Sequence, residues 1–301
     1  MKNFHIIILL PFYFFSLNGQ NEILLTNHFQ VTSNFNPSFT GNSKKTELTF
    51  LARQQWIGFN NAPSTHILIF ENYIEKIKSG IGIIVINDAL GNENNLNFKL
   101  NYNYKLQYSP SFSINTGISF GLLNSRINTD NLFYEEYDPN GLHEIYSIYS
   151  PTLIVGSMVT MKLITFGISF SKKIDNQKDI YKLIMPGYYH LYMDYVIPVS
   201  NSFIFIPMIN SIISRNYTIF DIGSRFLIKD KIHIGISCRL GESINGMLGY
   251  KMNSNIFLGY SYDLLIKDFS SYINGSHEIF INFKFDKKVK SYHYHKSPRY
   301  F

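Results

Sequence analysis

The sequence predicts an all-β protein, a transmembrane antiparallel β-barrel of about 14 strands with a periplasmic N-terminal arm and a C-terminal tail. Three observations predict this fold. Apolar and polar residues alternate with a period of two in many segments, short connections alternate with long ones, and no run of about 18 apolar residues follows the N-terminus. The last observation excludes membrane-spanning helices.

Residues 96–107, with the sequence LNFKLNYNYKLQ, form the clearest predicted strand. Every even position is apolar or aromatic and every odd position is polar. A period of two over about 12 residues gives one apolar face and one wet face, and such a segment can cross a bilayer at a tilt. We expect Leu100 to face lipid and Lys99 to face a water-lined lumen.

The same pattern places the other strands, with errors of a few residues at their ends. All the expected strands lie at about 46–54, 64–72, 79–88, 96–107, 112–124, 152–161, 163–170, 188–197, 203–213, 217–228, 231–239, 245–252, 255–263 and 277–285. Their number is even, as a closed antiparallel bacterial barrel requires. Pro207 falls inside a predicted strand and predicts a bulge there or a wrong boundary. These strands divide the chain into a predicted arm at 20–45, a barrel at 46–285 and a tail at 286–301.

Connection lengths support the barrel and orient it. Connections after even-numbered strands are mostly short, as at 108–111 and 229–230, whereas those after odd-numbered strands include long ones at 125–151 and 171–187. Outer-membrane barrels have short periplasmic turns and longer external loops. The alternation therefore predicts that both termini lie in the periplasm.

Composition agrees with a membrane barrel without requiring one. The chain is 45% hydrophobic and 16% aromatic, with a mean hydropathy of −0.04. Its 22 tyrosines and 26 phenylalanines suit aromatic girdles at two membrane interfaces, although a soluble β-rich protein can be as aromatic. Cys238 is the only cysteine, which excludes an intramolecular disulfide and a thiolate metal cluster.

The two ends of the chain carry distinct signals. Lys2, the apolar run 6–15 and the small and polar residues 16–19 predict a signal peptide over 1–19, cut before Gln20, and hence an exported protein. The net charge is +6, and the tail 286–301 holds +4 of the +5 that remains without the signal peptide. In a secreted barrel, a basic tail favours a protein or an anionic head group as its partner over nucleic acid.

Five short segments occur in an order that resembles a known family. They are NPSFTG at 36–41, RQQWIGFNNAPST at 53–65, GIGIIVINDALG at 80–91, GYSYD at 259–263 and GSHE at 275–278. With the predicted signal peptide and barrel, they resemble the PorP/SprF family of type IX secretion proteins over about 30–285. The resemblance implies a non-enzymatic barrel in the outer membrane of Bacteroidota. It also implies periplasmic ring components of the type IX system as partners. The resemblance further implies that a secreted surface protein with a C-terminal sorting domain is a candidate partner. It also implies a role in gliding motility.

These segments and the tail supply candidate interaction or structural residues. They are Arg53, Trp56, Gly58, Phe59, Asp88, Asp263, His277, Glu278, Arg299 and Phe301. Trp56 and Phe59 suit an interfacial anchor, with partner binding or the fixing of a plug as the alternative. Gly80 and Gly82 lead into an apolar strand with no helix after it. Turns, bulges or close packing are therefore favoured over a nucleotide loop.

Charged and histidine residues give no catalytic or metal constellation. Arg53 would lie near the lumen, where a charge usually has a partner. Its candidate partners are Glu71, Asp88 and Glu278. His277 and Glu278 are neighbours in a predicted strand, so they point to opposite faces and cannot share a site without a bulge. In the tail, His293 and His295 would share a face, but no further metal ligands are near in sequence.

The sequence therefore predicts a secretion component with no catalysis, cofactor, metal or nucleic acid. An outer-membrane channel for small or hydrophobic solutes is the first alternative. An outer-membrane enzyme would need a clustered nucleophile and base, which no spacing suggests. A soluble secreted β-sandwich would not alternate its loop lengths in this way.

Overall fold

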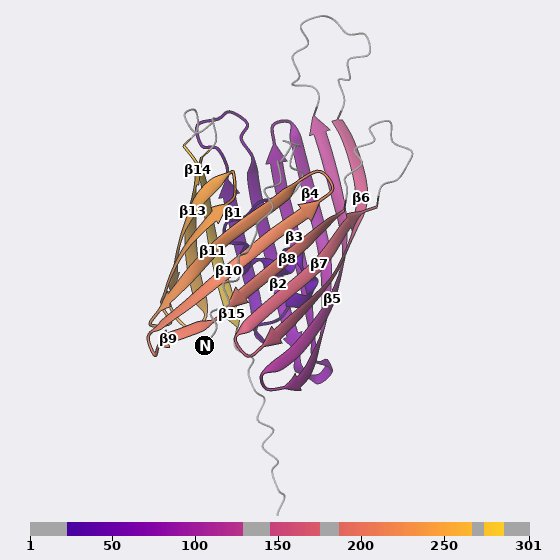
Figure 1. Ribbon diagram of the computed structural model, residues 1–301. Coiled ribbons are helices and arrows are strands. Elements are labelled where there is room, and N and C mark those ends of the chain that lie inside the picture. The colour runs from indigo at the N-terminus through magenta and orange to yellow at the C-terminus, as the bar shows by residue number, and fades with distance from the viewer. Residues whose placement is uncertain (1–22, 129–144, 175–186, 267–273, 286–301) are drawn as a thin grey trace, which may run out of the picture.

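A closed β-barrel forms the body of the protein in the computed structural model, which describes residues 23–128, 145–174, 187–266 and 274–285 (Figure 1). The elements are η1 (His28–Gln30), α1 (Thr32–Phe35), η2 (Pro37–Phe39), β1 (Thr46–Gln54), β2 (Ser64–Ile74), η3 (Glu75–Ile77), β3 (Ser79–Leu90), β4 (Glu93–Ser109), β5 (Phe112–Asn128), β6 (Ile145–Met161), β7 (Ile164–Lys173), β8 (Tyr188–Tyr195), β9 (Ile197–Ser200), β10 (Phe203–Ser214), β11 (Thr218–Ile228), β12 (Ile232–Arg239), β13 (Ser243–Lys251), β14 (Ile256–Leu265) and β15 (Ser276–Phe285). No helix among these residues is both long and apolar enough to cross a membrane.

Apart from β8 and β9, each wall strand pairs antiparallel with the next. β1 pairs with β15, from Thr46 opposite Phe285 to Gln54 opposite His277, which closes the ring. Both β8 and β9 pair with the same edge of β10, so together they fill one place in the wall. The predicted barrel of 14 strands is confirmed, with its eighth strand broken in two.

The expected bulge at Pro207 is wrong, because the irregularity lies in the neighbouring strand. Pro207 stays in register opposite Ser224 within β10. On its other side it faces the gap between β8, which ends its pairing at Asp194, and β9, which starts at Ile197. A proline has no N–H to donate, so the interruption falls where the missing hydrogen bond would have been made.

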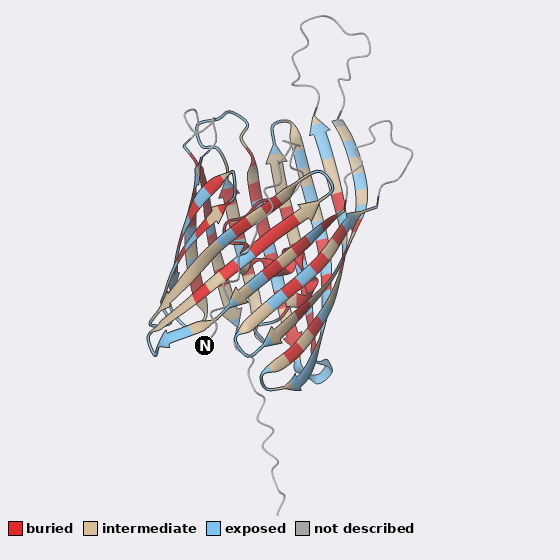
Figure 2. Ribbon diagram, in the orientation of Figure 1, coloured by how far each residue is buried: buried red, intermediate tan, exposed pale blue. Residues whose placement is uncertain are grey.

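Outer and inner faces alternate along the strands, as the buried and exposed segments in Figure 2 show. In β4, Leu100 is 49% exposed on the outside, whereas Lys99 is 6% exposed and donates from Nζ to Asn34 Oδ1 at 2.9 Å inside the barrel. The predicted register of this strand is therefore confirmed.

The N-terminal segment differs from the expected arm, because residues 23–41 lie inside the barrel; we call them the plug. Its apolar side chains pack against inward-facing aliphatic residues of β1, β2 and β3. The members of this core include Leu24, Leu25, Val31, Phe35, Leu51, Ile67, Ile69, Ile84 and Ile86. An inner wall with such residues would expose apolar surface in an open lumen, so it buries that surface against the plug instead. The expected water-lined lumen is wrong at this level of the barrel.

The two ends of the barrel differ in their connections. One end, which we call the short-turn end, holds Thr46, Phe285 and the connections 75–78, 110–111, 162–163, 201–202, 229–231 and 252–255. The other, the long-loop end, holds the connections 55–63, 129–144, 174–187 and 266–275, together with three shorter ones. The expected alternation is confirmed in its main lines. Figure 1 shows the short-turn end below and the long-loop end above.

Leu100→Arg tests the membrane register of β4. A charge placed at mid-membrane on the lipid face costs about 2–4 kcal/mol, so we expect much less assembled barrel than in the parent protein. Leu100→Met keeps the face apolar and serves as the control. The fraction of protein that shifts on a gel between unboiled and boiled samples measures assembly. Equal assembly of the two variants would contradict the register.

Candidate functional site

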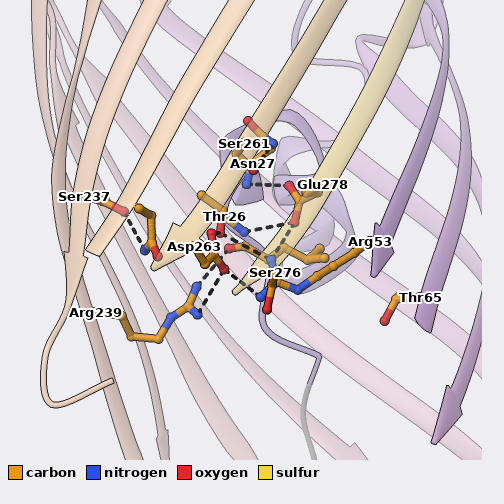
Figure 3. Close-up of polar contacts among 12 residues, drawn as sticks. Thr26, Asn27, Arg53, Thr65, Ser237, Arg239, Ser261, Asp263, Ser276 and Glu278 are labelled. Carbon is orange, nitrogen blue, oxygen red and sulfur yellow. Dashed lines mark hydrogen bonds and ion pairs between the residues drawn. The ribbon is translucent and has the colours of Figure 1, made fainter. Parts of the chain in front are cut away.

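A cluster of buried charges lies inside the barrel near its long-loop end (Figure 3). The register of the paired strands brings these charges together. Arg53 of β1 is directly opposite Glu278 of β15, and Asp221 of β11 is directly opposite Arg239 of β12. Asp263 of β14 completes the cluster, and all five residues lie on the inner face because they alternate with exposed outward residues. We call these five residues the charge cluster.

Ion pairs join the charge cluster into one network. Arg53 Nη2 lies 2.6 Å from Asp263 Oδ2, and Arg53 Nη1 lies 3.3 Å from Glu278 Oε2. Arg239 Nη2 lies 3.4 Å from Asp221 Oδ2, and Arg239 Nη1 lies 3.9 Å from Asp263 Oδ2. Each of the five side chains is at most 3% exposed. Removal of so many charges from water is costly unless every one is paired and hydrogen-bonded.

The plug supplies the remaining hydrogen bonds of the charge cluster. Glu278 accepts from the backbone N–H of Thr26 at 3.1 Å and of Asn27 at 2.7 Å. Thr26 Oγ1 donates to Asp263 Oδ1, and Arg239 Nη2 donates to the Leu25 carbonyl at 3.5 Å. The cluster thus holds the start of the plug, and the plug supplies hydrogen bonds to carboxylates that are removed from water. Such a shared network of buried polar groups stabilises both of its parts.

Inward-facing polar side chains of β4 and β5 hold the later part of the plug by its carbonyl groups. Lys99 Nζ donates to the Asn34 carbonyl at 3.2 Å, and Asn101 Nδ2 donates to the Ser33 carbonyl at 2.8 Å. Asn103 Nδ2 donates to the Thr40 carbonyl at 2.9 Å, and Asn115 Nδ2 donates to the Ser38 carbonyl at 3.3 Å. The polar face of β4, which predicted a wet lumen, therefore binds backbone in place of water.

Two inward glycines let the turn of the NPSFTG segment approach the wall. A Cβ atom on Gly80 would lie 2.0 Å from the Thr40 carbonyl oxygen, and one on Gly117 would lie 2.4 Å from the Pro37 carbonyl carbon. Any side chain at these positions would push the plug from the wall. The plug and the barrel wall are therefore in direct backbone contact.

Aromatic contacts anchor the plug on the opposite wall. Phe35 stacks on His190 of β8 with ring centroids 5.2 Å apart. The Arg225 guanidinium of β11 lies 4.2 Å from the centroid of the Phe29 ring. A buried cation over an aromatic face is attracted by its quadrupole. With the charge cluster and the β4 contacts, these pairs fix the plug to walls all around the barrel.

The sequence-predicted residues divide into an inner and an outer group. Arg53, Asp263 and Glu278 come together in the charge cluster, and Glu278 was one of the three expected partners of Arg53. Asp88 lies elsewhere and accepts from Thr65 Oγ1 at 2.5 Å. Glu71 is also separate and accepts from the Gly41 N–H at 3.4 Å. Arg53 therefore pairs with Glu278 and with Asp263, a partner that sequence reasoning did not assign.

Trp56, Gly58 and Phe59 lie in the connection between β1 and β2. This connection is fastened to the start of β15, because the Ile57 N–H donates to the Gly275 carbonyl at 3.0 Å and Ile57 accepts from the Asn274 N–H at 2.8 Å. Trp56 is 38% exposed and Phe59 is 61% exposed. Two aromatic side chains are thus held at the surface of the long-loop end.

His277 and Glu278 point to opposite faces, so they cannot form an acid–base pair. The His277 ring shares a hydrogen bond of 2.7 Å with the Tyr260 hydroxyl on the outside, whereas Glu278 lies in the charge cluster inside. Among the described residues, no three His, Cys, Asp or Glu side chains gather as metal ligands. Arg299, Phe301 and the two tail histidines lie outside the described residues.

Sequence reasoning missed four participants, Thr26, Asn27, Asp221 and Arg239. A usable signal existed for Arg239, which is a charge in the inward alternation of a strand and so needs an inward partner. No such signal existed for Thr26 and Asn27, because a plug has no periodicity that a sequence displays.

The family of the chain follows from a comparison with family models. The model of the type IX secretion system membrane protein PorP/SprF matches residues 17–283, which include the charge cluster, the plug and every wall strand but the last two residues of β15. The chain belongs to the PorP/SprF family. The resemblance of the five segments is thereby confirmed, and their buried members Arg53, Asp263 and Glu278 prove to be one structural unit.

Solved structures show the fold alone. The CymD monoaromatic hydrocarbon channel is 10% identical, with a TM-score of 0.52 and coverage of 85% of this chain and 93% of that chain. The toluene transporter TbuX of Ralstonia pickettii is 9% identical, with a TM-score of 0.52 and coverage of 82% and 90%. Omp33, an outer membrane protein of Acinetobacter baumannii, is 7% identical, with a TM-score of 0.51 and coverage of 80% and 98%. No curated protein sequence matches the chain.

Arg53→Met tests the charge cluster. This change leaves Asp263 and Glu278 buried with one cation fewer, and breaking a buried pair costs about 3–5 kcal/mol. We expect a large drop in the temperature at which the unboiled gel band converts to the unfolded one. The control is Lys251→Met, which breaks an exposed pair with Asp230 and costs at most about 1 kcal/mol. Equal drops for both variants would contradict a stabilising role for the cluster.

Gly80→Ala tests the contact between the plug and the wall. The new methyl group would overlap the Thr40 carbonyl, and overpacking of this kind costs about 1–3 kcal/mol. The matched control is Gly246→Ala in β13, where a Cβ meets nothing within 4 Å. Urea unfolding of refolded protein in micelles measures both. A Gly80→Ala variant as stable as the Gly246→Ala variant would show that the plug does not pack here.

Proposed function

We propose that this PorP/SprF protein is a non-enzymatic outer-membrane component of the type IX secretion or gliding machinery that acts by binding protein partners at its two ends. Family membership supports the machinery, and the plug supports binding over conduction. The observation that carries the proposal is that hydrogen bonds hold the plug both to the buried charge cluster and to inward side chains of β4 and β5.

A solute channel is the weaker alternative, because the plug fills the lumen of the barrel. The hydrocarbon channel and the toluene transporter share only the fold with this chain. A path through this barrel requires the plug to leave, which would break the bonds of Glu278 to Thr26 and Asn27 and expose the apolar inner wall. Such a displacement has a large free-energy cost, because buried carboxylates would lose their donors.

Orientation follows from the rule that outer-membrane barrels have short periplasmic turns and longer external loops. On that rule the short-turn end, with Thr46 and Phe285, faces the periplasm, and the long-loop end faces the cell exterior. Periplasmic ring components would meet the short-turn end and the tail. A secreted surface protein would meet the long-loop end, where Trp56 and Phe59 are exposed.

Affinity purification from detergent-solubilised membranes, followed by mass spectrometry, tests the proposed function. We expect ring components or a surface protein with a sorting domain to co-purify, and loss of the gene to impair secretion of such a protein. A liposome flux of small solutes that no secretion partner affects, combined with purification of the barrel alone, would favour the channel.

Deletion of 297–301 tests the tail, which we propose docks on a periplasmic partner. The deletion removes the aromatic residues Tyr300 and Phe301 with Arg299, and it keeps most of the tail charge. Interfaces favour aromatic and arginine anchors, so we expect reduced co-purification of the partner with normal barrel assembly. Co-purification and secretion that both survive the deletion would exclude this docking role.

A further inference from the structure

The short-turn end of the barrel is strongly basic. Its described residues include eleven basic and five acidic residues, a balance of +6. The basic residues are Lys44, Lys45, Lys76, Lys78, Lys105, Lys162, Lys229, Lys231, Lys251, Lys284 and Arg225, and the acidic residues are Glu47, Glu71, Glu75, Asp194 and Asp230. In the sequence, residues 286–301 carry a further +4. At the long-loop end, positive and negative charges of the described residues balance.

Three of these lysines, Lys105, Lys251 and Lys284, occupy inward positions of the strand alternation. Lys105 follows the buried Asn103 on the inner face of β4, and Lys284 follows the buried Asn282 on the inner face of β15. Lys251 ends the inward series of β13. Lys231 lies beside it in the connection 229–231, where its carbonyl accepts from the Lys251 N–H at 2.8 Å. The inward direction of Lys284 is confirmed by its ion pair, because its Nζ lies 2.8 Å from Glu47 Oε1 and Glu47 is an inward residue of β1.

The outward positions at this end carry a different chemistry. They hold exposed aromatic side chains, namely Tyr104, Tyr108, Tyr195, Tyr250 and Phe285. Lysines that served lipid head groups would point outward among these rings, as they do in other membrane proteins. Here the aromatic rings occupy the outward positions, whereas Lys105, Lys251 and Lys284 occupy inward positions at the mouth of the barrel. The charge is therefore directed at a soluble molecule in front of the mouth.

A small apolar hollow lies beside Lys251. It is lined by Phe29 of the plug and by Met247, Phe257 and Phe280 of the wall. Phe257 is directly opposite Lys251 in the pairing of β13 with β14, so the hollow and the lysines adjoin. Positive charge and apolar surface thus lie side by side at this end of the barrel.

We propose that the short-turn mouth of the barrel, with Lys105, Lys231, Lys251 and Lys284 around it, binds an acidic segment of a soluble protein partner. The inference rests on the proposed function, since it takes this end to face the periplasm. Charge complementarity carries it, because a balance of +6 at one end attracts and orients an acidic partner before contact. The inward direction of the lysines selects a segment at the mouth over the membrane surface.

A binding measurement with the full-length protein in phosphatidylcholine nanodiscs tests the proposal. The probe is a fluorescent peptide of glutamates around one phenylalanine, and a peptide with lysines in place of the glutamates is its control. The test variant combines Lys231→Gln, Lys251→Gln and Lys284→Gln. The matched control combines Arg126→Gln, Lys172→Gln and Arg215→Gln, which removes the same charge from the long-loop end.

We expect the acidic peptide to bind, with an affinity that falls as salt rises and that drops about tenfold in the mouth variant. The control variant with three substitutions at the long-loop end should change the affinity for the acidic peptide less than twofold. The basic peptide should not bind to the parent protein. Equal losses in both variants, or no binding to the parent protein, would overturn the proposal. A mouth variant that keeps the acidic peptide and loses only added phosphatidylglycerol would also overturn it, in favour of a lipid site.

Measurements in cells separate this proposal from the proposed function. If ring components co-purify with the parent protein and equally with the mouth variant, the acidic-segment proposal fails and the proposed function stands. If no secretion component co-purifies with the parent protein, the proposed function fails whatever the peptide does. Heat-modifiable migration of each variant verifies that the barrel has assembled.

Discussion

The carboxylate of Glu278 is enclosed in the barrel with a side chain that water does not reach, so protein groups must balance its charge. Arg53 does so from the paired strand β1, and two consecutive N–H groups of the plug do so from within. This requirement joins the first and last wall strands to the segment that precedes them both. Barrel closure and plug placement thus depend on the same few bonds.

The interior follows from that dependence. Because the start of the plug is held at the charge cluster, the rest of it crosses the barrel and covers the aliphatic inner wall of β1, β2 and β3. The wall in turn presents Lys99, Asn101 and Asn103 to plug carbonyls, and Gly80 leaves room for its turn. A lumen of this kind is a protein core, and it suits a rigid membrane platform better than a conduit.

Because the plug fills the lumen, the proposed binding surfaces lie at the two ends of the barrel. The short-turn end combines inward lysines with an apolar hollow, and the long-loop end exposes Trp56 and Phe59 on a connection fastened to β15. The two ends of the barrel thus present different side chains, basic at one end and aromatic at the other. Such an arrangement fits a component that joins different proteins on the two sides of a membrane.

The sequence by itself determined the class of fold, because a period of two with alternating loop lengths reports which face of each strand meets lipid. It gave 14 strands, the inward direction of Lys99 and the opposite directions of His277 and Glu278. Only the tertiary structure decided that Asp263 joins Arg53, that β8 and β9 share one place in the wall and that the N-terminal segment fills the lumen. The reason is physical. A polar inner face satisfies its hydrogen bonds equally well with water or with plug backbone, so local alternation cannot distinguish an open lumen from a filled one.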